Sequence, residues 1–296
     1  MCIRDSVYTG ADKPSRRQPF EEMRAYLNEH SHRIKYLCLH GLLAVDSVEY
    51  IIRQMQKMAP DSHSFILDMH QVSGISESAA RLLAQARLAF GKDGIAVVYS
   101  RIQGRKAIIE RLSKSVLKGD RGFLSFEDND LAAEWCENRL LGEASWTPTT
   151  SIPLHRAPLF TGVPDPLMKL VEASTSSRLF APGERILEAG QTSDGNVYII
   201  ESGKVSILVP LVHGAHQRVA SLGPGMNFGE MVLFGQTTRS ATVVADTETT
   251  CRILAADELD RISKQEPLLK IILLENLGKD MANSLRRATQ WIAALA

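Results

Sequence analysis

Short apolar runs alternate with amphipathic segments through the first half of the chain. Runs rich in Val, Ile and Phe predict buried strands, whereas apolar residues at spacings of three and four predict helices. The predicted strands are Ile34–His40, Ser64–Asp68, Ile95–Tyr99 and Phe123–Phe126, and the predicted helices are Ser47–Met58, Ser78–Phe90, Lys106–Leu117 and Asp128–Leu141. Such alternation is typical of a largely parallel sheet covered by helices, so we expect an α/β domain here.

The second half has a different pattern. Val197–Ile200 and Lys204–Val209 are β-branched runs that flank the turn Ser202-Gly203, and further Pro-Gly and Asp-Gly turns surround them. Short strands separated by glycine turns predict an antiparallel, mainly-β roll. The expected divisions are a polar lead-in at residues 1–30, an α/β domain at 31–141, a Pro- and Thr-rich linker at 142–156, the roll at 157–265 and a long helix at 266–296.

The final helix carries one apolar stripe at spacings of three and four, made of Leu274, Leu277, Met281, Leu285, Ala288, Ile292 and Leu295. Such a stripe is expected to be buried, because burying a large aliphatic side chain contributes about 1.5–3 kcal/mol of stabilising free energy. Three interpretations stay open: packing on the roll itself, a lid over a ligand, or a seam in a homodimer.

Composition narrows the class of protein. The 34 basic and 34 acidic residues balance, so no long-range field favours DNA or an anionic membrane. The four cysteines have no metal-ligand spacing and suggest buried thiols in a reducing compartment. No apolar run approaches a membrane span and no leader pattern is visible, so we expect a cytoplasmic protein. Met1–Ser6 resembles a string found at broken ends of reading frames, which suggests that the true protein continues upstream.

The segment from Phe228 to Val243, called the cassette below, combines residues suited to a phosphorylated sugar. Gly229 has no Cβ and lets the backbone approach a ligand closely. Glu230 supplies a carboxylate acceptor for a ribose hydroxyl. A short apolar helix expected to start near Met231 would point free N–H groups at an anion.

Two further residues complete the predicted cassette. Arg239 offers a permanently charged planar fork to phosphate oxygens, and Ser240 offers a further donor. Phe-Gly-Glu followed nine residues later by Arg-Ser-Ala resembles the phosphate-binding cassette of cyclic-nucleotide-binding domains of the catabolite-activator type. The resemblance implies that Glu230 binds the ribose 2′-hydroxyl and Arg239 the cyclic phosphate, although Thr238 stands where many members have Pro. The expected binding residues are Phe228, Gly229, Glu230, Met231, Arg239 and Ser240.

The first half resembles a STAS domain, the fold of anti-sigma-factor antagonists and of sulfate-permease tails. Phe65–Asp68, the turn Ile75–Ala79 and the closing stretch Trp135–Leu141 carry the resemblance. Ser78 occupies the place of the phosphorylated serine and is a candidate phosphoacceptor. Its neighbours depart from the usual Ile-Asp-Ser-Ser-Gly, and the preferred interpretation is a hydroxyl at a helix start.

No residues assemble a nucleophile, a base and an orienting group, so we expect no catalytic site and no enzyme activity in this chain. Ser115–Lys118 fits Ser-x-x-Lys, a pattern short enough to arise by chance, and it has no recognisable partner motifs. His213 and His216 flank Gly214, where a solvated turn is the preferred interpretation over a metal site, so no metal is predicted.

We therefore expect a regulatory module that binds a cyclic nucleotide, with cyclic AMP favoured over cyclic GMP, and relays binding through the STAS-like domain to a protein partner or an upstream domain. No helix-turn-helix follows the final helix, so DNA is not an expected partner. This domain pair resembles the C-terminal regulatory half of long bacterial glutaminases, or of sulfate-permease-like proteins. The alternative is a nucleotide-blind interaction scaffold.

Overall fold

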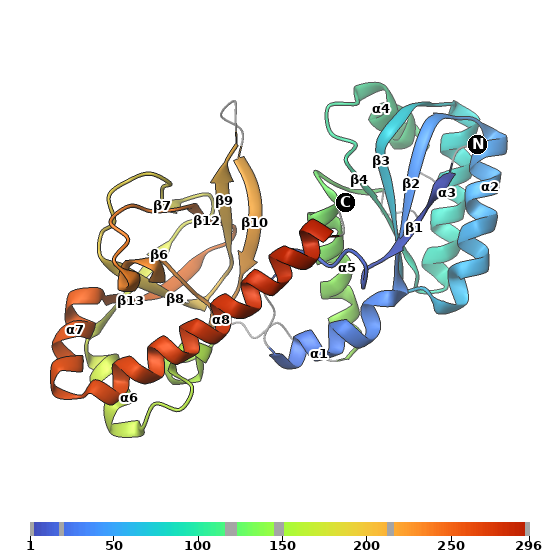
Figure 1. Cartoon of the computed structure of the whole chain (residues 1–296). Coiled ribbons are helices and arrows are strands. Elements are labelled where there is room, and N and C mark those ends of the chain that lie inside the picture. Colours follow the sequence, from blue (N-terminus) through green and yellow to red (C-terminus); the bar gives the residue numbers. More distant parts are fainter. Residues whose placement is uncertain (1–2, 18–20, 116–122, 145–150, 212–215, 294–296) are drawn as a thin grey trace. The chain divides into compact units, whose positions relative to one another are not determined.

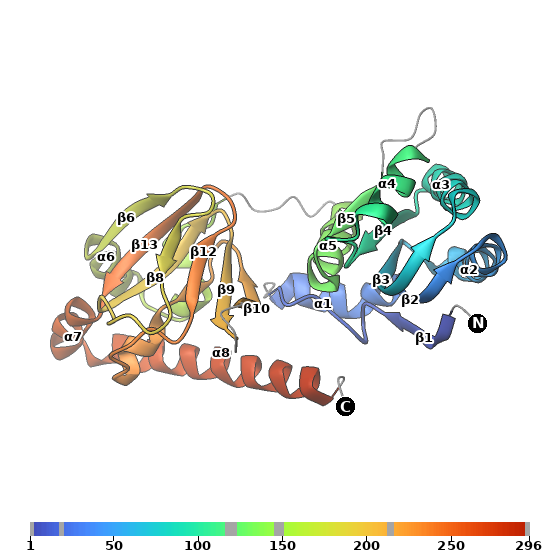
Figure 2. The same cartoon turned by 90° about the horizontal axis from the view of Figure 1, so that it is seen from above.

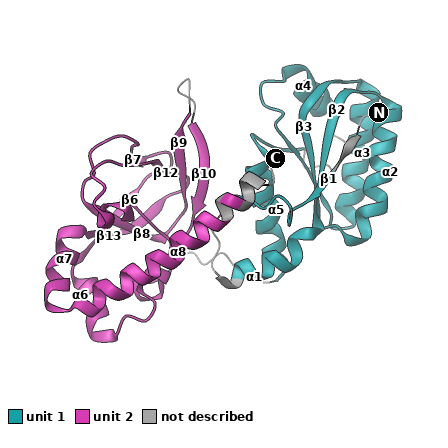
Figure 3. Cartoon of the chain, viewed as in Figure 1, with its two compact units in different colours: residues 1–15, 20–147 teal, residues 16–19, 148–296 magenta. Residues whose placement is uncertain are grey.

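The computed structural model describes residues 3–17, 21–115, 123–144, 151–211 and 216–293, with the side chains of some terminal residues left out. The chain forms two compact units, residues 1–15 with 20–147 and residues 16–19 with 148–296 (Figure 3). Each unit has its own hydrophobic core and is described by itself.

The first unit is built on one five-stranded sheet with helices on both faces (Figure 1). Strands β2 to β5 pair in parallel, and β1 joins the edge antiparallel to β2. The strands, in spatial order, are β1 (Ile3–Thr9), β2 (Ile34–Leu43), β3 (Ser64–Ile75), β4 (Ala96–Ser100) and β5 (Leu124–Phe126). The helices are α1 (Glu21–His30), α2 (Val45–Met58), α3 (Glu77–Lys92), α4 (Lys106–Lys114) and α5 (Asn129–Glu143), with 3₁₀ turns η1 (Ser31–Arg33) and η2 (Ala59–Asp61).

Alternate residues of the strands face two separate apolar layers. On β3, Phe65 and Leu67 pack with α2, α3 and α4, whereas Ile66 between them packs with α1 and α5. The same alternation on β4 sends Tyr99 to the first layer and Val98 to the second. This unit is an α/β sandwich, as the alternating sequence pattern predicts.

The N-terminal stretch corrects the sequence interpretation. Residues 1–30 were expected to be a polar lead-in, yet they contain strand β1 and helix α1. Met23 and Leu27 of α1 are buried against the sheet. The few apolar residues of this stretch therefore suffice, because an edge strand and a one-sided helix need only one buried face.

A buried carboxylate ties three elements of this sheet together. Asp68 on β3 is 2% exposed and accepts hydrogen bonds from Arg101, which follows β4, and from Asn129 at the start of α5. Burial alone would raise the pKa of Asp68, but these hydrogen bonds outweigh it, so the pKa lies below its ordinary value. Arg101 adopts a φ of +56°, in the left-handed region that residues with a Cβ rarely adopt, and its backbone N–H donates to the carbonyl of Phe126 at 3.0 Å.

The second unit is a β-roll of two four-stranded antiparallel sheets with helices at one side (Figures 1 and 2). One sheet has the order β10-β9-β12-β7 and the other β11-β8-β13-β6. The strands are β6 (Thr175–Phe180), β7 (Arg185–Leu187), β8 (Asn196–Ser202), β9 (Val205–Pro210), β10 (His216–Leu222), β11 (Asn227–Phe228), β12 (Thr242–Ala245) and β13 (Thr249–Ala255). The helical elements are η3 (Leu154–Arg156), η4 (Pro158–Phe160), α6 (Asp165–Ala173), η5 (Glu230–Phe234), α7 (Ala256–Gln265) and α8 (Pro267–Ala293).

Strand β8 separates two cores. Tyr198 and Ile200 point into the roll, while Val197 and Ile199 pack outward against the helices. Helices α6, α7 and α8 cover that outer face, and α8 runs along one side of the roll (Figure 2). No described helix is both long enough and apolar enough to cross a membrane.

Helix α8 forms as predicted, but it packs through a different stripe. Leu269, Leu273 and Leu277 are at most 2% exposed against the roll. Of the predicted stripe only Leu277 is among them, whereas Met281 and Leu285 are 41% and 70% exposed. The buried leucines lie in the N-terminal part of α8, and the predicted stripe continues beyond them to exposed side chains. The side chains of Ala288, Ile292 and Leu295 lie outside the described residues.

Candidate functional site

Arg239, the predicted phosphate ligand, is held inside the roll by the protein itself. Its residue is 7% exposed, and its backbone is fixed by hydrogen bonds with Gln191 and Gly190. Nη1 donates to the carbonyl of Gly229 at 2.9 Å, and Nη2 donates to the carbonyl of Asn196 at 3.0 Å and to the carboxylate of Asp194. The guanidinium is therefore oriented before any ligand arrives.

One nitrogen of this guanidinium has no acceptor among the residues that the structure describes. The Nε atom of Arg239 is buried, and no described residue accepts its hydrogen bond. A buried donor without a partner costs about 1–3 kcal/mol, so it is a place where a ligand acceptor would be stabilising.

Asp194 is the anionic partner of this arginine. The other oxygen of its carboxylate accepts a hydrogen bond from the Tyr198 hydroxyl at 2.5 Å. Burial would raise the pKa of Asp194, but the hydrogen bonds from Tyr198 and Arg239 lower it further than burial raises it. Burial, followed by the charge and hydrogen bond of Asp194, raises the pKa of Tyr198 to about 12.

Gly229 is required at its place for two reasons. Its φ of +81° lies in the left-handed region that residues with a Cβ rarely adopt. A Cβ there would also stand 3.0 Å from Nη1 of Arg239 and 3.0 Å from the carbonyl oxygen of Asn196. Phe228 beside it is buried and stacks on Tyr198 with ring centroids 5.0 Å apart. The Phe-Gly pair thus brings the cassette backbone against the arginine.

The predicted cassette helix is shorter than expected. Residues Glu230–Phe234 form a five-residue 3₁₀ segment, η5, bounded by left-handed Gly229 and Gly235. So short a segment sums few peptide dipoles, and the expected helix N-terminus is not an anion site by itself. An anion here would depend on individual N–H groups and on Arg239.

The cassette lines a cavity of about 230 Å³. All six predicted binding residues contribute to its wall: Phe228, Gly229, Glu230, Met231, Arg239 and Ser240. Apolar residues of β9 and β10 form a second side. Asp280, Met281 and Ser284 of α8 form another, so the helix borders the cavity. The volume lies just below the range of about 300–1,000 Å³ that is usual for small-molecule sites.

Glu230 is a half-buried acid in this cavity. Burial raises the pKa of its carboxyl, and the negative charge of Asp280 raises it further, while Arg239 acts in the opposite direction. A carboxyl group in this setting accepts a hydroxyl hydrogen when ionised and donates one when protonated.

Ser78, the candidate phosphoacceptor, lies in the first unit. It is exposed in the first turn of α3. Ser78 therefore lies at the helix start, as expected, but the hydroxyl that caps this helix belongs to Ser76, which accepts from the Ala79 backbone N–H at 3.2 Å.

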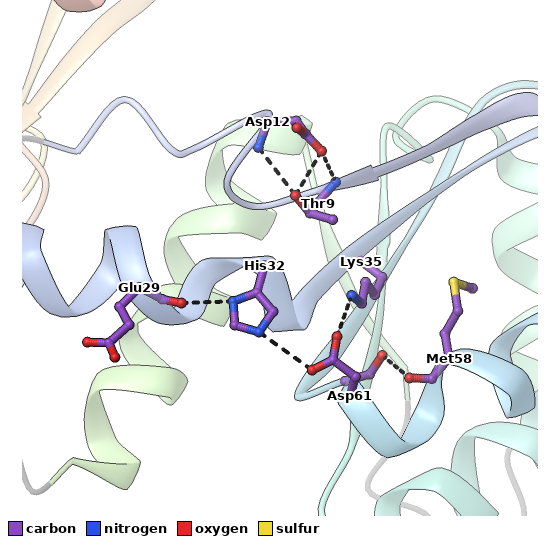
Figure 4. Close-up of polar contacts among 8 residues, drawn as sticks. Thr9, Asp12, Glu29, His32, Lys35, Met58 and Asp61 are labelled. Carbon is purple, nitrogen blue, oxygen red and sulfur yellow. Dashed lines mark hydrogen bonds and ion pairs between the residues drawn. The ribbon is translucent and has the colours of Figure 1, made fainter.

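The first unit also has an exposed ionic cluster near the N-terminal ends of β2 and β3 (Figure 4). Asp61 lies 3.1 Å from the Lys35 ammonium and 3.5 Å from Nε2 of His32, and the hydrogen bond from Lys35 lowers its pKa. The side chain of Asp61 is 65% exposed, which marks a solvated ion pair of small energetic value.

The Ser-x-x-Lys pattern and the histidine pair of the sequence form no functional site among the described residues. Ser115 is 4% exposed and its hydroxyl donates to the carbonyl of Arg111 at 2.7 Å, which does not suit a nucleophile. Lys118, His213 and Gly214 lie outside the described residues. Within the described ranges no three His, Cys, Asp or Glu side chains come together as a metal site.

Sequence reasoning missed two groups of residues at this site. Asp194 was interpreted only as part of an Asp-Gly turn, and its role beside Arg239 depends on pairing between segments distant in sequence. Asp280 and Ser284 are four residues apart on α8, and only the packing of that helix turns them toward the cavity. The signal in the sequence was that these two polar residues each directly precede a residue of the apolar stripe, Met281 and Leu285.

Comparison with known proteins matches the roll to a protein family. Residues 177–266 match the cyclic nucleotide-binding domain family. Over 284 residues the chain is 29% identical to Glutaminase 2 of Bradyrhizobium diazoefficiens, a match covering 95% of this chain and 44% of that protein. It is 31% identical over 132 residues to the cyclic AMP receptor protein of Thermus thermophilus, covering 45% of this chain and 59% of the relative. The crystal structure of the Thermus thermophilus catabolite activator protein superposes with a TM-score of 0.41 and 30% identity, over 47% of this chain and 62% of that one.

Residues 177–266 thus form a cyclic nucleotide-binding domain of the catabolite-activator type. The chain spans less than half the length of the glutaminase relative that it matches. The family match lies entirely in the second unit. The structure shows that the first unit is α/β, and its STAS-like character stays a prediction.

Proposed function

We propose that this chain is a regulatory module whose cassette cavity binds a cyclic nucleotide, with cyclic AMP as the favoured ligand. The observation that carries the proposal is the buried, pre-oriented Arg239, which lines the cavity together with Glu230 and Ser240 and whose Nε has no acceptor among the described residues. A cyclic phosphate supplies acceptors for such a donor, and a ribose hydroxyl supplies a donor for the Glu230 carboxylate.

In this proposal the protein needs little rearrangement to hold the phosphate. Asp194 and the carbonyls of Gly229 and Asn196 fix the guanidinium plane, so the ligand does not have to order a long side chain. Ser240 is exposed at the cavity and adds a hydroxyl donor. Since α8 borders the cavity, a ligand that binds one position of this helix better than another would shift its equilibrium.

Titration calorimetry of the purified chain with cyclic AMP and with cyclic GMP tests the proposal. We expect dissociation constants at or below about micromolar, and the ratio of the two constants gives the preference. Glu230→Gln keeps the size of the side chain and removes its charge, so it should weaken binding. An absence of heat and of thermal shift with either nucleotide at about millimolar concentration would favour the nucleotide-blind scaffold instead.

We further propose that the first unit is STAS-like and relays the signal to a protein partner or to an upstream domain of a longer protein. The 95% coverage by the Bradyrhizobium glutaminase relative supports a glutaminase-like parent over a sulfate-permease-like one. Such a module would act in the cytoplasm. Exposed Met281 and Leu285 on α8 leave a homodimer open as an assembly.

The regulatory assignment predicts that this chain alone hydrolyses no glutamine. The supporting observation is the buried Ser115 with its hydroxyl committed to a helix carbonyl. Glutamine hydrolysis by the purified chain that Ser115→Ala abolishes would overturn this part of the proposal.

A further inference from the structure

Two carboxyl groups from different elements line the same cavity. Glu230 begins η5 in the cassette, and Asp280 lies on α8. Each is half-buried. Like charges that share a partly desolvated space repel, and the more buried group then holds its proton more tightly.

Among the described residues, Asp280 and Arg239 are the charged groups that act on Glu230. Arg239 favours the ionised form, but its charge is already engaged by Asp194. Burial raises the pKa most; the hydrogen bond from the backbone of Glu230 itself lowers it and Asp280 raises it again, so the pKa of Glu230 lies above its ordinary value. Asp280 therefore influences the protonation of Glu230 from across the cavity.

We propose that Asp280 is a positioning residue of the nucleotide site, acting through Glu230 so that the affinity for a cyclic nucleotide falls as the solution is acidified. The inference rests on the proposed function. Protonation of Glu230 occupies one of its two carboxyl oxygens and removes the charge that strengthens a hydrogen bond from a ribose hydroxyl. Removing the charge of Asp280 lowers the pKa of Glu230, so the affinity for the nucleotide falls at a lower pH.

The linkage between proton binding and nucleotide binding gives the direction of the pH dependence of affinity. The free protein binds a proton at Glu230 that the complex releases, so affinity rises with pH through the titration of Glu230 and is flat above it. The site thereby binds its ligand less well in an acidified compartment. Since α8 carries Asp280, any movement of this helix away from the cavity also removes the repulsion.

The test compares nucleotide affinity at about pH 7.5 and at about pH 5 in four proteins. For the wild type we expect a loss of affinity on acidification, because the pKa of Glu230 lies above its ordinary value. Asp280→Asn should lose less affinity than the wild type, and Asp280→Glu, which restores the charge, should behave as the wild type. Glu275→Gln removes one negative charge from an exposed position on the same helix and should keep the wild-type profile. Thermal unfolding at both pH values controls for loss of fold.

A ligand-free measurement separates the inference from the proposed function. The Glu230 carboxyl, followed by carbon NMR in the free protein, should titrate at lower pH in Asp280→Asn than in the wild type. An unchanged titration, or an affinity profile that is the same in both proteins, overturns the inference while nucleotide binding stands. Failure of every protein to bind a nucleotide at either pH refutes the proposed function instead, even if the titration shifts.

Discussion

The guanidinium of Arg239 forms an ion pair with the carboxylate of Asp194 inside the β-roll, and the Tyr198 hydroxyl donates to the other oxygen of that carboxylate. The arginine side chain is 6% exposed and that of the aspartate 41%. This pair joins the cassette to the turn before β8, so the residue proposed to hold the phosphate also holds part of the fold together.

Arg239→Ala should therefore cost stability as well as affinity. Because the change removes hydrogen bonds to Asp194, Asn196 and Gly229, we expect a loss of about 1–3 kcal/mol in the free energy of unfolding. Affinity for cyclic AMP should fall by about 1.5–3 kcal/mol.

Urea denaturation and calorimetry measure the two effects. Arg185→Ala is the matched control, because the Arg185 side chain is 58% exposed and forms a surface ion pair with Glu188. If Arg239→Ala unfolds at the same urea concentration as the wild type, the structural role assigned to this ion pair is wrong.

Asp194→Asn should make the stability of the roll less dependent on pH in acid. The pKa of Asp194 is below the ordinary value of 3.8 in the folded protein, so its contribution is present above that value and is lost as pH falls through the lower folded value. The difference in melting temperature between wild type and variant should be largest near neutral pH and shrink below about pH 4. A difference that stays constant into strong acid would contradict the ion pair.

Gly229→Ala should destabilise the roll more than Gly235→Ala. Both glycines have a φ of +81°, so both substitutions carry backbone strain of about 1–2 kcal/mol. A Cβ at Gly235 meets nothing within 4 Å, whereas one at Gly229 approaches Arg239 and the Asn196 carbonyl. The difference in unfolding free energy isolates the steric part, and equal losses would show that the cassette backbone can move away from the arginine.

Leu273→Ala and Leu285→Ala distinguish the two faces of α8. Leu273 is 1% exposed against the roll, so its truncation should cost about 2–5 kcal/mol. Leu285 is 70% exposed, and its truncation should change stability by less than about 0.5 kcal/mol. Sedimentation accompanies the denaturation measurements. A large loss at Leu285 together with dissociation would show that a second subunit covers this face.

The sequence indicated the elements of both units well where the apolar pattern was strong. Strand β3 illustrates a limit, since Ser64–Asp68 was predicted and Ser64–Ile75 forms. Its second half carries polar residues that take strand geometry from pairing with β2. Strand β1 was missed for a similar reason, because an edge strand draws its stability from the neighbour with which it pairs.

Local chemistry was sufficient to place Gly229, Glu230 and Arg239 in one cassette, because turn glycines and the spacing of charged residues are properties of a short segment. The tertiary structure alone decided that Asp194 fixes Arg239 and that Asp280 lies on the same cavity as Glu230. It also decided that Leu269 and Leu273, rather than Met281 and Leu285, bury α8. Those outcomes depend on which surfaces meet after the roll has closed, and the free energy of burial belongs to the pair of surfaces rather than to either segment.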